Sequence, residues 1–553
     1  MNRRIRSRRV IHNAWMFLVL LHGCVTGCSL VISSIFNVRD FGATGDGRTA
    51  DTRAIQAAVE ACREAGGGTV LFTAGTYVTG TFRIYGRMTL RLEAGSVILA
   101  SPDTSLYGLQ SAFGLSGASS FGVSGSGAGR RTGVIVAKDA EEITITGQGV
   151  LDGNGNSFFD FQRPHLALDF DPALTRQGSL LANPRYCLDD GPFLAKAGWN
   201  DRPGTMAIFW NCGRVRLEGV TIRNAPNWTV HFQNCDDVDV TGVTIRNSFL
   251  LPNDDGIDVY DSRNVRISDC LIHSGDDCIA VIGSENVAVS NCVFRSRSAG
   301  IRIGYGTNDV RNCVFQNVVI DTSNRGVGIF VRGRGSIENV LFSNVTIRTR
   351  LVNGSWWGRG EPIHISVLRY GGVAESGRIR NVRFSNVSAE GENGVVLYGF
   401  REGSIEDVAL DGVGIRMTTG PNGLLAGGNF DLRPSEKMET SVFKHDIPGV
   451  FARFVRGLRL RDVEVDWPDA PLDYFSNGIR CERVSDLVID GFAGRQASRS
   501  GEAVRLDSCG NVTVRNCVVK NGTDVFLTST RSEGEPFLSG NDLRNSLKPV
   551  LRN

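Results

Sequence analysis

From about residue 215 onward, the chain repeats one short pattern in which apolar and polar residues alternate before an Asn, Gly or other small residue. Clear instances are Val215-Arg216-Leu217, Val238-Asp239-Val240 and Val265-Arg266-Ile267. Alternation with a period of two is typical of a β-strand. The stretches are too short, and too closely punctuated by Gly and Asn, for helices to lie between them. The pattern therefore predicts many short strands.

The spacing of these strands predicts a solenoid. Val215, Val238, Val265 and Val287 stand 23, 27 and 22 residues apart, and a period in the twenties is typical of stacked repeats. A leucine-rich horseshoe would need Leu at several fixed positions of each repeat, whereas the inward positions here are Val, Ile and Phe. We therefore predict an all-β solenoid, a single-stranded right-handed parallel β-helix in which each coil rises by ~4.8 Å.

The predicted solenoid has a cap and several insertions. Ile55, Ala58, Val59 and Cys62 form the apolar stripe of a short N-terminal helix, which begins near Asp51 or Thr52 and covers the open end of the solenoid. Segments that break the repeat indicate insertions, which in solenoids often lie on the binding face. The predicted organisation is a catalytic β-helix domain over 36–545, with insertions near 102–132, 154–202 and 354–370, and a C-terminal tail over 546–553.

The first 35 residues resemble an export signal. Five arginines between Arg3 and Arg9 precede the apolar run Ala14–Leu21, which is too short to span a bilayer. Val25-Thr26-Gly27-Cys28 follows and resembles a lipoprotein cleavage site, with Cys28 as the lipidated residue. Ordinary signal cleavage nearby is the alternative. Either interpretation predicts an exported protein, anchored in the cell envelope or secreted.

Charge and cysteine content exclude several classes of partner. With 60 basic and 58 acidic residues the net charge is +2, so no strong field attracts the chain to nucleic acid. The 13 cysteines include no tight C-x-x-C pair, which argues against a zinc site. Several share one context, as in Asn211-Cys212, Asn234-Cys235 and Asn291-Cys292, and this repetition favours buried structural thiols over a disulfide framework.

Two acidic phrases lie beside the repeat: Asn253-Asp254-Asp255 and Gly275-Asp276-Asp277. Asp255 and Asp276 stand 21 residues apart, about one coil, so stacking brings the acids together. Crowded carboxylates raise at least one pKa. One protonated and one ionised carboxyl can perform inverting glycoside hydrolysis across a gap of ~6.5–9.5 Å. The alternatives are solvated turn caps and a Ca²⁺ site.

These motifs resemble the polygalacturonase family, glycoside hydrolase family 28, whose members are pectin-degrading parallel β-helix enzymes. Besides the two acidic phrases, Asn37-Val38-Arg39-Asp40-Phe41-Gly42-Ala43, Arg202-Pro203 and Asn224-Ala225-Pro226-Asn227-Trp228 are similar to family segments. Asn253-Asp254-Asp255 matches the family's Asn-Thr-Asp. The resemblance implies that Asp276 is the general acid, that Asp255 and Asp277 activate water with inversion, and that Asn253 binds substrate, with no metal or cofactor.

The chain departs from the family at its basic positions. The family's Gly-His-Gly falls at Ser298-Ala299-Gly300, its Arg-Ile-Lys at Phe330-Val331-Arg332, and Ile282 stands where many members carry Lys. We predict that Arg302 and Arg332 replace the missing charges and hold an acidic sugar, since Arg binds carboxylates bidentately. Alternatively, the two arginines pair with the acidic cluster and lower its pKa values.

Some other residues have two interpretations. Trp356-Trp357 is either a platform for sugar stacking or an anchor for its own loop. His231, His273 and His364 are predicted to be hydrogen-bonded structural residues.

The predicted function is cleavage of a pectic, galacturonate-containing polysaccharide or oligosaccharide by a monomer that meets a membrane only through a lipid anchor. A polysaccharide lyase that uses Ca²⁺ and a non-catalytic carbohydrate-binding β-helix are the alternatives. A strict calcium requirement with an unsaturated product would identify the lyase, and binding without any product would identify the non-catalytic protein.

Overall fold

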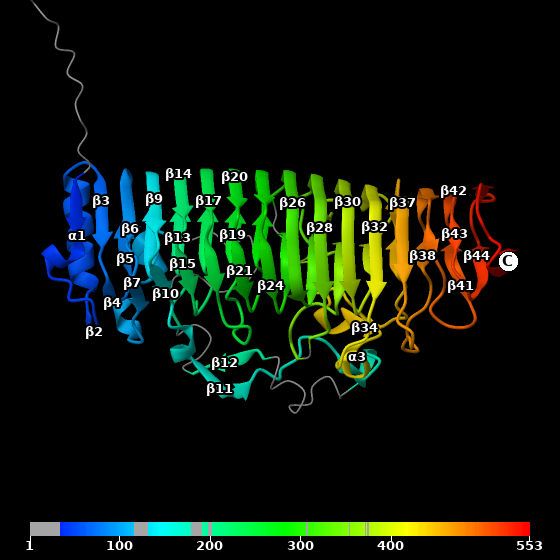
Figure 1. Cartoon of the computed structure of the whole chain (residues 1–553), viewed down its shortest axis with the longest axis horizontal. Helices are drawn as coiled ribbons and strands as arrows, with labels where there is room; N and C mark the ends of the chain where they lie inside the picture. Colours follow the sequence, from blue (N-terminus) through cyan, green and yellow to red (C-terminus); the bar gives the residue numbers. More distant parts are fainter. Residues whose placement is uncertain are drawn as a thin grey trace, which may run out of the picture. The chain divides into compact units, whose positions relative to one another are not determined.

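The computed structural model describes residues 34–115, 131–178, 191–196, 202–305, 308–352, 354–370, 372 and 375–552. Over these residues the chain is a parallel β-helix, which confirms the predicted fold class (Figure 1). The export signal and Cys28 lie outside the described residues. Within the described residues, no helix has the length and apolar character needed to cross a bilayer.

The predicted capping helix is confirmed as α1 (Thr52–Glu64). Its stripe of Ile55, Ala58, Val59 and Cys62 is fully buried against the first coils. Asp51 occupies the N-cap position, but its side chain makes no capping bond to the helix. It accepts hydrogen bonds from the backbone N–H groups of Thr44 (2.8 Å) and Gly45 (3.1 Å) instead, so it secures the preceding turn.

One 15-stranded sheet runs along the solenoid, and every neighbouring pair in it is parallel (Figure 1). Its outer face carries the candidate site. The strands, in chain order, are β5 (Phe82–Ile84), β8 (Ile135–Lys138), β13 (Ala207–Trp210), β16 (Val230–Gln233), β19 (Ile257–Tyr260), β22 (Ile279–Ile282), β25 (Ala299–Gly304), β27 (Arg325–Val331), β29 (Glu361–Val367), β31 (Val395–Gly399), β35 (Val450–Arg453), β38 (Ile479–Glu482), β41 (Glu502–Asp507), β44 (Thr523–Thr530) and β46 (Ser546–Arg552).

The rest of each coil belongs to a 27-stranded sheet. Its strands are β1 (Ile35–Asn37), β2 (Asp46–Ala50), β3 (Gly68–Phe72), β4 (Gly75–Thr79), β6 (Met88–Leu92), β7 (Ser96–Ala100), β9 (Glu141–Gly147), β10 (Val150–Asp152), β14 (Gly213–Glu218), β15 (Thr221–Arg223), β17 (Asp236–Thr241), β18 (Thr244–Arg246), β20 (Arg263–Ser268), β21 (Leu271–Ser274), β23 (Glu285–Ser290), β24 (Val293–Ser296), β26 (Val310–Ser323), β28 (Ile337–Thr349), β30 (Ile379–Gly391), β32 (Ile405–Met417), β36 (Val455–Arg456), β37 (Arg459–Asp466), β39 (Ser485–Asp490), β40 (Ala493–Gly494), β42 (Gly510–Arg515), β43 (Val518–Val519) and β45 (Phe537–Ser539).

The repeat in the sequence is the register of this sheet. Val215 pairs with Val238, Val238 with Val265, and Val265 with Val287, each one coil further along. All four side chains are buried. Like residues therefore stack above one another inside the solenoid, and apolar burial of this kind is the main stabilising contribution.

A ladder of asparagines connects successive strands of the 27-stranded sheet. Asn286 donates to Asn264, Asn312 to Asn286, Asn339 to Asn312 and Asn381 to Asn339, through their side-chain amides. All five residues have left-handed backbone conformations, with φ between 52° and 59°. Asn tolerates this conformation better than most residues, and each amide can both donate and accept, so the ladder continues from coil to coil.

The ten cysteines among the described residues are buried and free. Cys212 and Cys235 occupy equivalent places in successive coils, next to the paired strands β14 and β17. This confirms, for the described residues, the interpretation of the cysteines as structural thiols.

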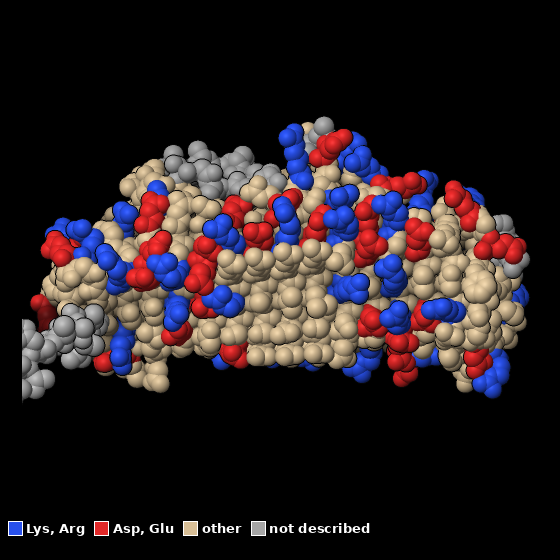
Figure 2. Space-filling model, turned by 90° about the horizontal axis from the view of Figure 1, so that it is seen from above, with Lys and Arg blue, Asp and Glu red and all other residues tan. Residues whose placement is uncertain are grey.

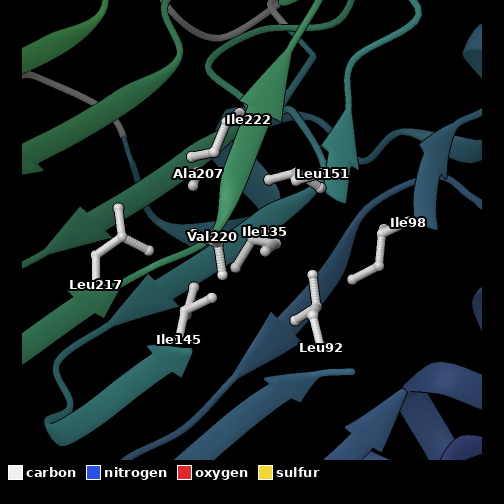
Figure 3. A pocket seen from close by; sticks show the side chains of 9 residues that line it. All are labelled: Leu92, Ile98, Ile135, Ile145, Leu151, Ala207, Leu217, Val220 and Ile222. Atoms are coloured by element: carbon white, nitrogen blue, oxygen red, sulfur yellow. The ribbon is translucent and has the colours of Figure 1, made fainter. Parts of the chain in front are cut away.

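Inside the first coils, nine aliphatic side chains surround a small apolar gap (Figure 3). They are Leu92, Ile98, Ile135, Ile145, Leu151, Ala207, Leu217, Val220 and Ile222. All belong to the interior of the solenoid and none carries a polar group. The gap is a feature of core packing, and it lies apart from the acidic residues.

The segments that leave the coils differ in part from the predicted insertions. Between β10 and β13 the chain forms η5 (Gly155–Phe158), β11 (Phe159–Pro164), η6 (Pro172–Leu174) and β12 (Phe193–Ala195), and β11 pairs antiparallel with β12. The described part of the segment predicted at 102–132 contains η2 (Thr104–Leu106) and η3 (Gln110–Phe113). In the segment predicted at 354–370, residues 361–367 are instead the coil strand β29.

Two further boundaries differ from the prediction. Between β32 and β35 the chain leaves the coil to form α3 (Gly423–Ala426), η8 (Met438–Thr440) and the antiparallel pair β33 (Asn429–Asp431) and β34 (Val442–Lys444), an excursion absent from the predicted organisation. At the C-terminus, β46 pairs with β44 and continues the sheet through Arg552, past the predicted end of the solenoid at residue 545. In Figure 1 the excursion and β11–β12 lie along the same edge of the strands.

Figure 2 shows one face of the molecule, on which acidic and basic side chains are interspersed. Ion pairs also connect neighbouring coils, for example Arg266 with Asp239 and Arg295 with Asp321. Paired charges of both signs on neighbouring coils fit the small net charge of the chain.

Candidate active site

The predicted acidic residues come together where the chain enters two neighbouring strands. Asp255 lies just before β19 and Asp277 just before β22. Because Ile257 pairs with Ile279, Asp255 and Asp277 occupy equivalent places in successive coils. One carboxylate oxygen from each of Asp255, Asp276 and Asp277 lies within 4.8 Å of the other two. Asp255 and Asp277 are 3% and 5% exposed, and Asp276 is partly exposed.

The carboxylates lie close together, as their one-coil spacing predicted. A gap of ~6.5–9.5 Å is usual between the acid and the base of an inverting glycosidase, and about 5–5.5 Å in a retaining one. The oxygens of this trio that approach one another most closely are within 4.8 Å. Their spacing therefore does not by itself indicate inversion, and the stereochemistry has to be measured.

The pKa of Asp276 is raised although two hydrogen bonds from Asn253 favour its ionised form. Its Oδ2 accepts hydrogen bonds from the backbone N–H of Asn253 (3.1 Å) and from its side-chain Nδ2 (3.4 Å). Burial and the neighbouring charge of Asp277 raise the pKa of Asp276 to about 6. A carboxyl with that pKa retains its proton in mildly acidic solution, where a free Asp has lost it. Asn253, predicted to bind substrate, thus also contacts the candidate acid.

Asp277 is the most firmly hydrogen-bonded of the three. Its Oδ1 accepts hydrogen bonds from the Ser298 hydroxyl (3.0 Å) and the Ala299 backbone N–H (3.1 Å), and its Oδ2 accepts one from Arg302 Nε. Ser298 and Ala299 stand where the resemblance places Gly-His-Gly. Arg302 takes part in the site as the partner of an acid, which is the geometry of the alternative interpretation.

Asp255 offers an oxygen that no other described residue uses. Its Oδ1 is buried and has no hydrogen-bond partner within the described chain, while its Oδ2 lies 3.7 Å from Arg302 Nη2. Burial, and then the charges of Asp276, Asp258 and Asp277, raise the pKa of Asp255 well above its usual range. Such interacting carboxyls titrate as one set, and the unused oxygen is available to accept a proton from water.

The structure does not fit the role predicted for Arg332. Its guanidinium is buried and donates to the carbonyl groups of Pro434, Val331, Ser366 and Leu432 and to the Ser366 hydroxyl. An Arg side chain has five N–H donors, and all five are used within the protein. Arg332 thus attaches residues 432–434 of the excursion to the solenoid and has no donor left for a sugar.

Sequence reasoning missed Arg325 and Asp258. Arg325 is buried in line with the trio, because Asp277 neighbours Ala299 and Ala299 pairs with Arg325 on β27. Its position 26 residues after Ala299, about one coil, is the signal that could have identified it. Asp258 is fully buried on β19, and neither of its oxygens has a hydrogen-bond partner among the described residues.

The neighbouring aromatic and histidine residues are mostly structural. His231 stacks on Trp228 at 5.3 Å, and burial lowers its pKa to about 4. His364 is buried between Glu361 and Ser366, and its pKa is also about 4, chiefly because of burial. Trp357 Nε1 donates to Asp169 Oδ2 (3.0 Å), so it ties its own loop to the insertion.

Trp356 also connects its loop to another segment. It is 4% exposed, and its carbonyl accepts a hydrogen bond from Arg433 of the excursion. The pair Trp356-Trp357 thus connects three segments, as expected of a loop anchor. His273 lies on β21 with its ring 5.9 Å from that of Phe249.

Comparison with known proteins identifies the segment that holds this site. Residues 195–421 match the model of glycosyl hydrolases family 28. Over this segment, about two fifths of its length, the chain is similar to that family. Residues 35–98 match a second model, rhamnogalacturonase A/epimerase, pectate lyase-like. The family 28 match includes the three aspartates, Arg302 and Arg332, whereas the second match covers the capping helix and the first coils.

Among curated proteins, the chain is similar to a probable polygalacturonase of Vitis vinifera, with 32% identity over 232 residues. That match covers 41% of this chain and 40% of the relative, so the chain spans well under half the length of that relative.

Two solved structures share the fold. The Yersinia enterocolitica family 28 exopolygalacturonase has a TM-score of 0.55 and 19% identity, and the match covers 83% of this chain and 78% of that one. The Thermotoga maritima exopolygalacturonase has a TM-score of 0.52 and 22% identity, with 70% and 87% covered. At these identities the likeness concerns the fold alone.

Proposed function

We propose that this protein is a glycoside hydrolase that cleaves glycosidic bonds in a pectic, galacturonate-containing polysaccharide or oligosaccharide. One observation carries the proposal: three aspartates from two successive coils meet within 4.8 Å, and the pKa of the partly exposed one is raised to about 6. The match of residues 195–421 to glycosyl hydrolases family 28 supports the same chemistry.

The geometry supports a division of roles. Asp276 is exposed enough to reach a substrate and donates its proton to the glycosidic oxygen as the bond to the anomeric carbon breaks. Asp255 accepts a proton from a water molecule through its unused Oδ1, and the oxygen of that water bonds to the anomeric carbon. Asp277, paired with Arg302, maintains negative charge beside the developing oxocarbenium ion. The products are a hemiacetal and an alcohol, and the net reaction consumes one water.

The choice of an acidic sugar rests on Arg302, the cationic residue that contacts the trio. It is buried, and a desolvated guanidinium attracts a carboxylate more strongly than an exposed one. Arg325, one coil further on, already pairs with the buried carboxylate of Glu361 (3.4 Å). The similar Vitis vinifera protein is described as a probable polygalacturonase, which supports the same substrate class.

The deciding experiment is a product profile of the purified protein on a panel of pectic and neutral polymers. We expect new reducing ends from polygalacturonate and none from a neutral glucan. Proton NMR of the first product then reports its anomeric configuration, and inversion is expected from the family resemblance. An unsaturated product would indicate the lyase, and binding without any product would indicate the non-catalytic protein.

We further propose that the protein is exported and lipidated at Cys28, and that it acts as a monomer. The basic residues, the apolar run and Val25-Thr26-Gly27-Cys28 support the first part. The second part is supported by the candidate site, whose three aspartates all come from one chain.

A further inference from the structure

Asp254 lies between Asn253 and Asp255 in the sequence, but its side chain contacts the main chain of the next coil. Its Oδ1 accepts hydrogen bonds from two consecutive backbone N–H groups of the next coil, those of Gly275 (2.7 Å) and Asp276 (3.0 Å). The side chain is fully buried. A single carboxylate oxygen therefore holds the main chain at the residue assigned as proton donor.

The same stretch of main chain is held from its other side. The backbone carbonyl of Asp276 accepts hydrogen bonds from the Ser274 hydroxyl and from the Ser296 hydroxyl, each at 2.6 Å. The peptide groups on both sides of the Asp276 Cα are thus fixed, and its carboxyl can move only by rotation about side-chain bonds. The contact with Asn253 restrains that rotation.

The turn at Gly275 is closely packed, so there is little room for Asp254 or the turn to shift. A Cβ at residue 275 would lie 2.3 Å from the Leu251 carbonyl oxygen and 2.8 Å from Asp254 Oδ1. The turn that carries Asp276 therefore fits tightly between residues 248–254 and its own coil. Without the oxygen of Asp254, two buried N–H groups would lose their acceptor, which is costly enough to reorganise the turn.

Residue 254 is also a point at which this chain differs from the family motif, since Asp replaces the Thr of Asn-Thr-Asp. A carboxylate has an acceptor oxygen that reaches further than a Thr hydroxyl. The second oxygen, Oδ2, is buried and has no hydrogen-bond partner among the described residues. Burial, and then the charge of Asp276, raise the pKa of Asp254 well above its usual range.

We propose that Asp254 is a positioning residue that fixes the main chain of Asp276 and so keeps its carboxyl directed at the glycosidic oxygen. This inference rests on the proposed function, because it takes Asp276 to be the proton donor. A displacement of a reacting group by about 1 Å can reduce a rate by about 100-fold. Asp254 therefore affects turnover without touching the substrate.

Two substitutions separate hydrogen bonding from charge. Asp254→Asn keeps an Oδ1 acceptor for both N–H groups, whereas Asp254→Ala removes it. We expect Asp254→Ala to lower kcat by about 10- to 100-fold with KM within twofold of the parent, and Asp254→Asn to keep kcat within about threefold. Asp237→Ala, at an exposed residue of β17, is the matched control. Two outcomes would overturn the proposal. In the first, Asp254→Ala folds and keeps the kcat of the parent; in the second, the kcat of Asp254→Asn falls as far as that of Asp254→Ala.

Amide hydrogen exchange provides a readout that needs no activity. The peptide containing Gly275 and Asp276 should exchange faster in Asp254→Ala than in the parent, and at the parent's rate in Asp254→Asn. If Asp254→Ala does not fold, Asp254→Asn decides: slow exchange at this peptide with retained kcat supports the positioning role, and slow exchange with lost kcat refutes it. If the parent itself cleaves no glycan, the proposed function fails, while faster exchange in Asp254→Ala still shows that Asp254 holds this turn.

Discussion

Arg302 Nε donates to Asp277 Oδ2, and the Nη2 of the same guanidinium lies 3.7 Å from Asp255 Oδ2. One cation thus joins two of the three acids, from a strand one coil beyond Asp277. Its positive charge lowers the pKa values of Asp255 and Asp276, against the larger effect of burial, which raises them. The arginine therefore favours the ionised forms of Asp255 and Asp276.

Removing this charge should shift the pH dependence of the reaction. In Arg302→Ala the acids lose their nearest cation, so their pKa values rise and the base becomes protonated at a higher pH. We expect the acid limb of the kcat/KM profile to move upward and kcat to fall by about 100-fold or more, because a transition-state interaction is lost. Arg302→Lys retains the charge but not the bidentate geometry. Its kcat and the acid limb of its profile should therefore lie between those of the parent and those of Arg302→Ala.

The substrate distinguishes the two roles of Arg302. If it also binds the sugar carboxylate, the variant loses more on a uronate polymer than on a neutral one, through KM. Equal losses on both polymers with an unchanged KM would leave only the electrostatic role. A pH profile identical to that of the parent would contradict the role of Arg302 in the acid set.

Arg332→Ala should affect stability more than binding. The substitution removes five N–H donors and leaves buried acceptors unsatisfied around Pro434, Leu432 and Ser366. We expect a loss of at least about 2 kcal/mol in the free energy of unfolding, measured by urea denaturation, while KM stays within about twofold. Arg348→Ala, at a half-exposed arginine paired with Asp321, is the control and should cost less than about 1 kcal/mol. A stable Arg332→Ala with a sharply raised KM would restore the substrate-binding role.

The sequence was sufficient to predict the repeating part of the fold. The alternation at Val215 and Val238 indicates the period of a strand, and spacings of 22 to 27 residues indicate stacked coils. The excursion that contains α3 and the β33–β34 pair could not be predicted in this way. It has no repeat of its own, and it is held by long-range contacts such as that of Arg332 with Pro434, 102 residues apart.

For the site, the sequence located the three aspartates because their one-coil spacing is visible. It could not show that Arg302 bridges two of them, or that Arg332 is fully used by backbone carbonyls, because the direction of a long side chain depends on tertiary contacts. Arg325 was missed although its coil position is equivalent to that of Ala299. The aspartates were found by register, and the arginines required the packed structure.

The proposed hydrolysis should not need a metal ion. The three carboxylates could hold a cation by their spacing alone, but the guanidinium of Arg302 already supplies a positive charge to Asp277 and Asp255. We expect the initial rate on polygalacturonate to change by less than twofold after dialysis against EDTA, and addition of Ca²⁺ to have no effect. A rate abolished by EDTA and restored by Ca²⁺, with an unsaturated product, would favour the lyase alternative.

The mature N-terminus should begin at a lipid-modified Cys28. This prediction follows from Val25-Thr26-Gly27-Cys28 after a basic and apolar leader. Mass spectrometry of the protein from a bacterial membrane fraction should show a diacylglycerol adduct on the peptide that starts at Cys28. Cys28→Ala should remove the adduct and release the protein from the membrane fraction. An unmodified terminus elsewhere would refute lipidation and leave secretion in place.

Asp276→Asn should abolish turnover while making the folded protein more stable at neutral pH. The amide cannot donate a proton as a carboxylic acid does, so kcat should fall by about 10²–10⁴-fold.

In the parent, the pKa of Asp276 is about 6 in the folded state, against a usual 3.8. The folded state then holds a proton that the unfolded state has released, so stability falls as pH rises from about 4 through 6. The variant does not lose stability in this way. Between pH 4 and pH 7 we expect its free energy of unfolding to rise by on the order of 1–2 kcal/mol relative to that of the parent. Urea denaturation at both pH values measures the gain, with Asp237→Asn at an exposed residue of β17 as the control. Near-parental turnover by folded Asp276→Asn would exclude Asp276 as the acid, and an equal stability difference at both pH values would contradict its raised pKa.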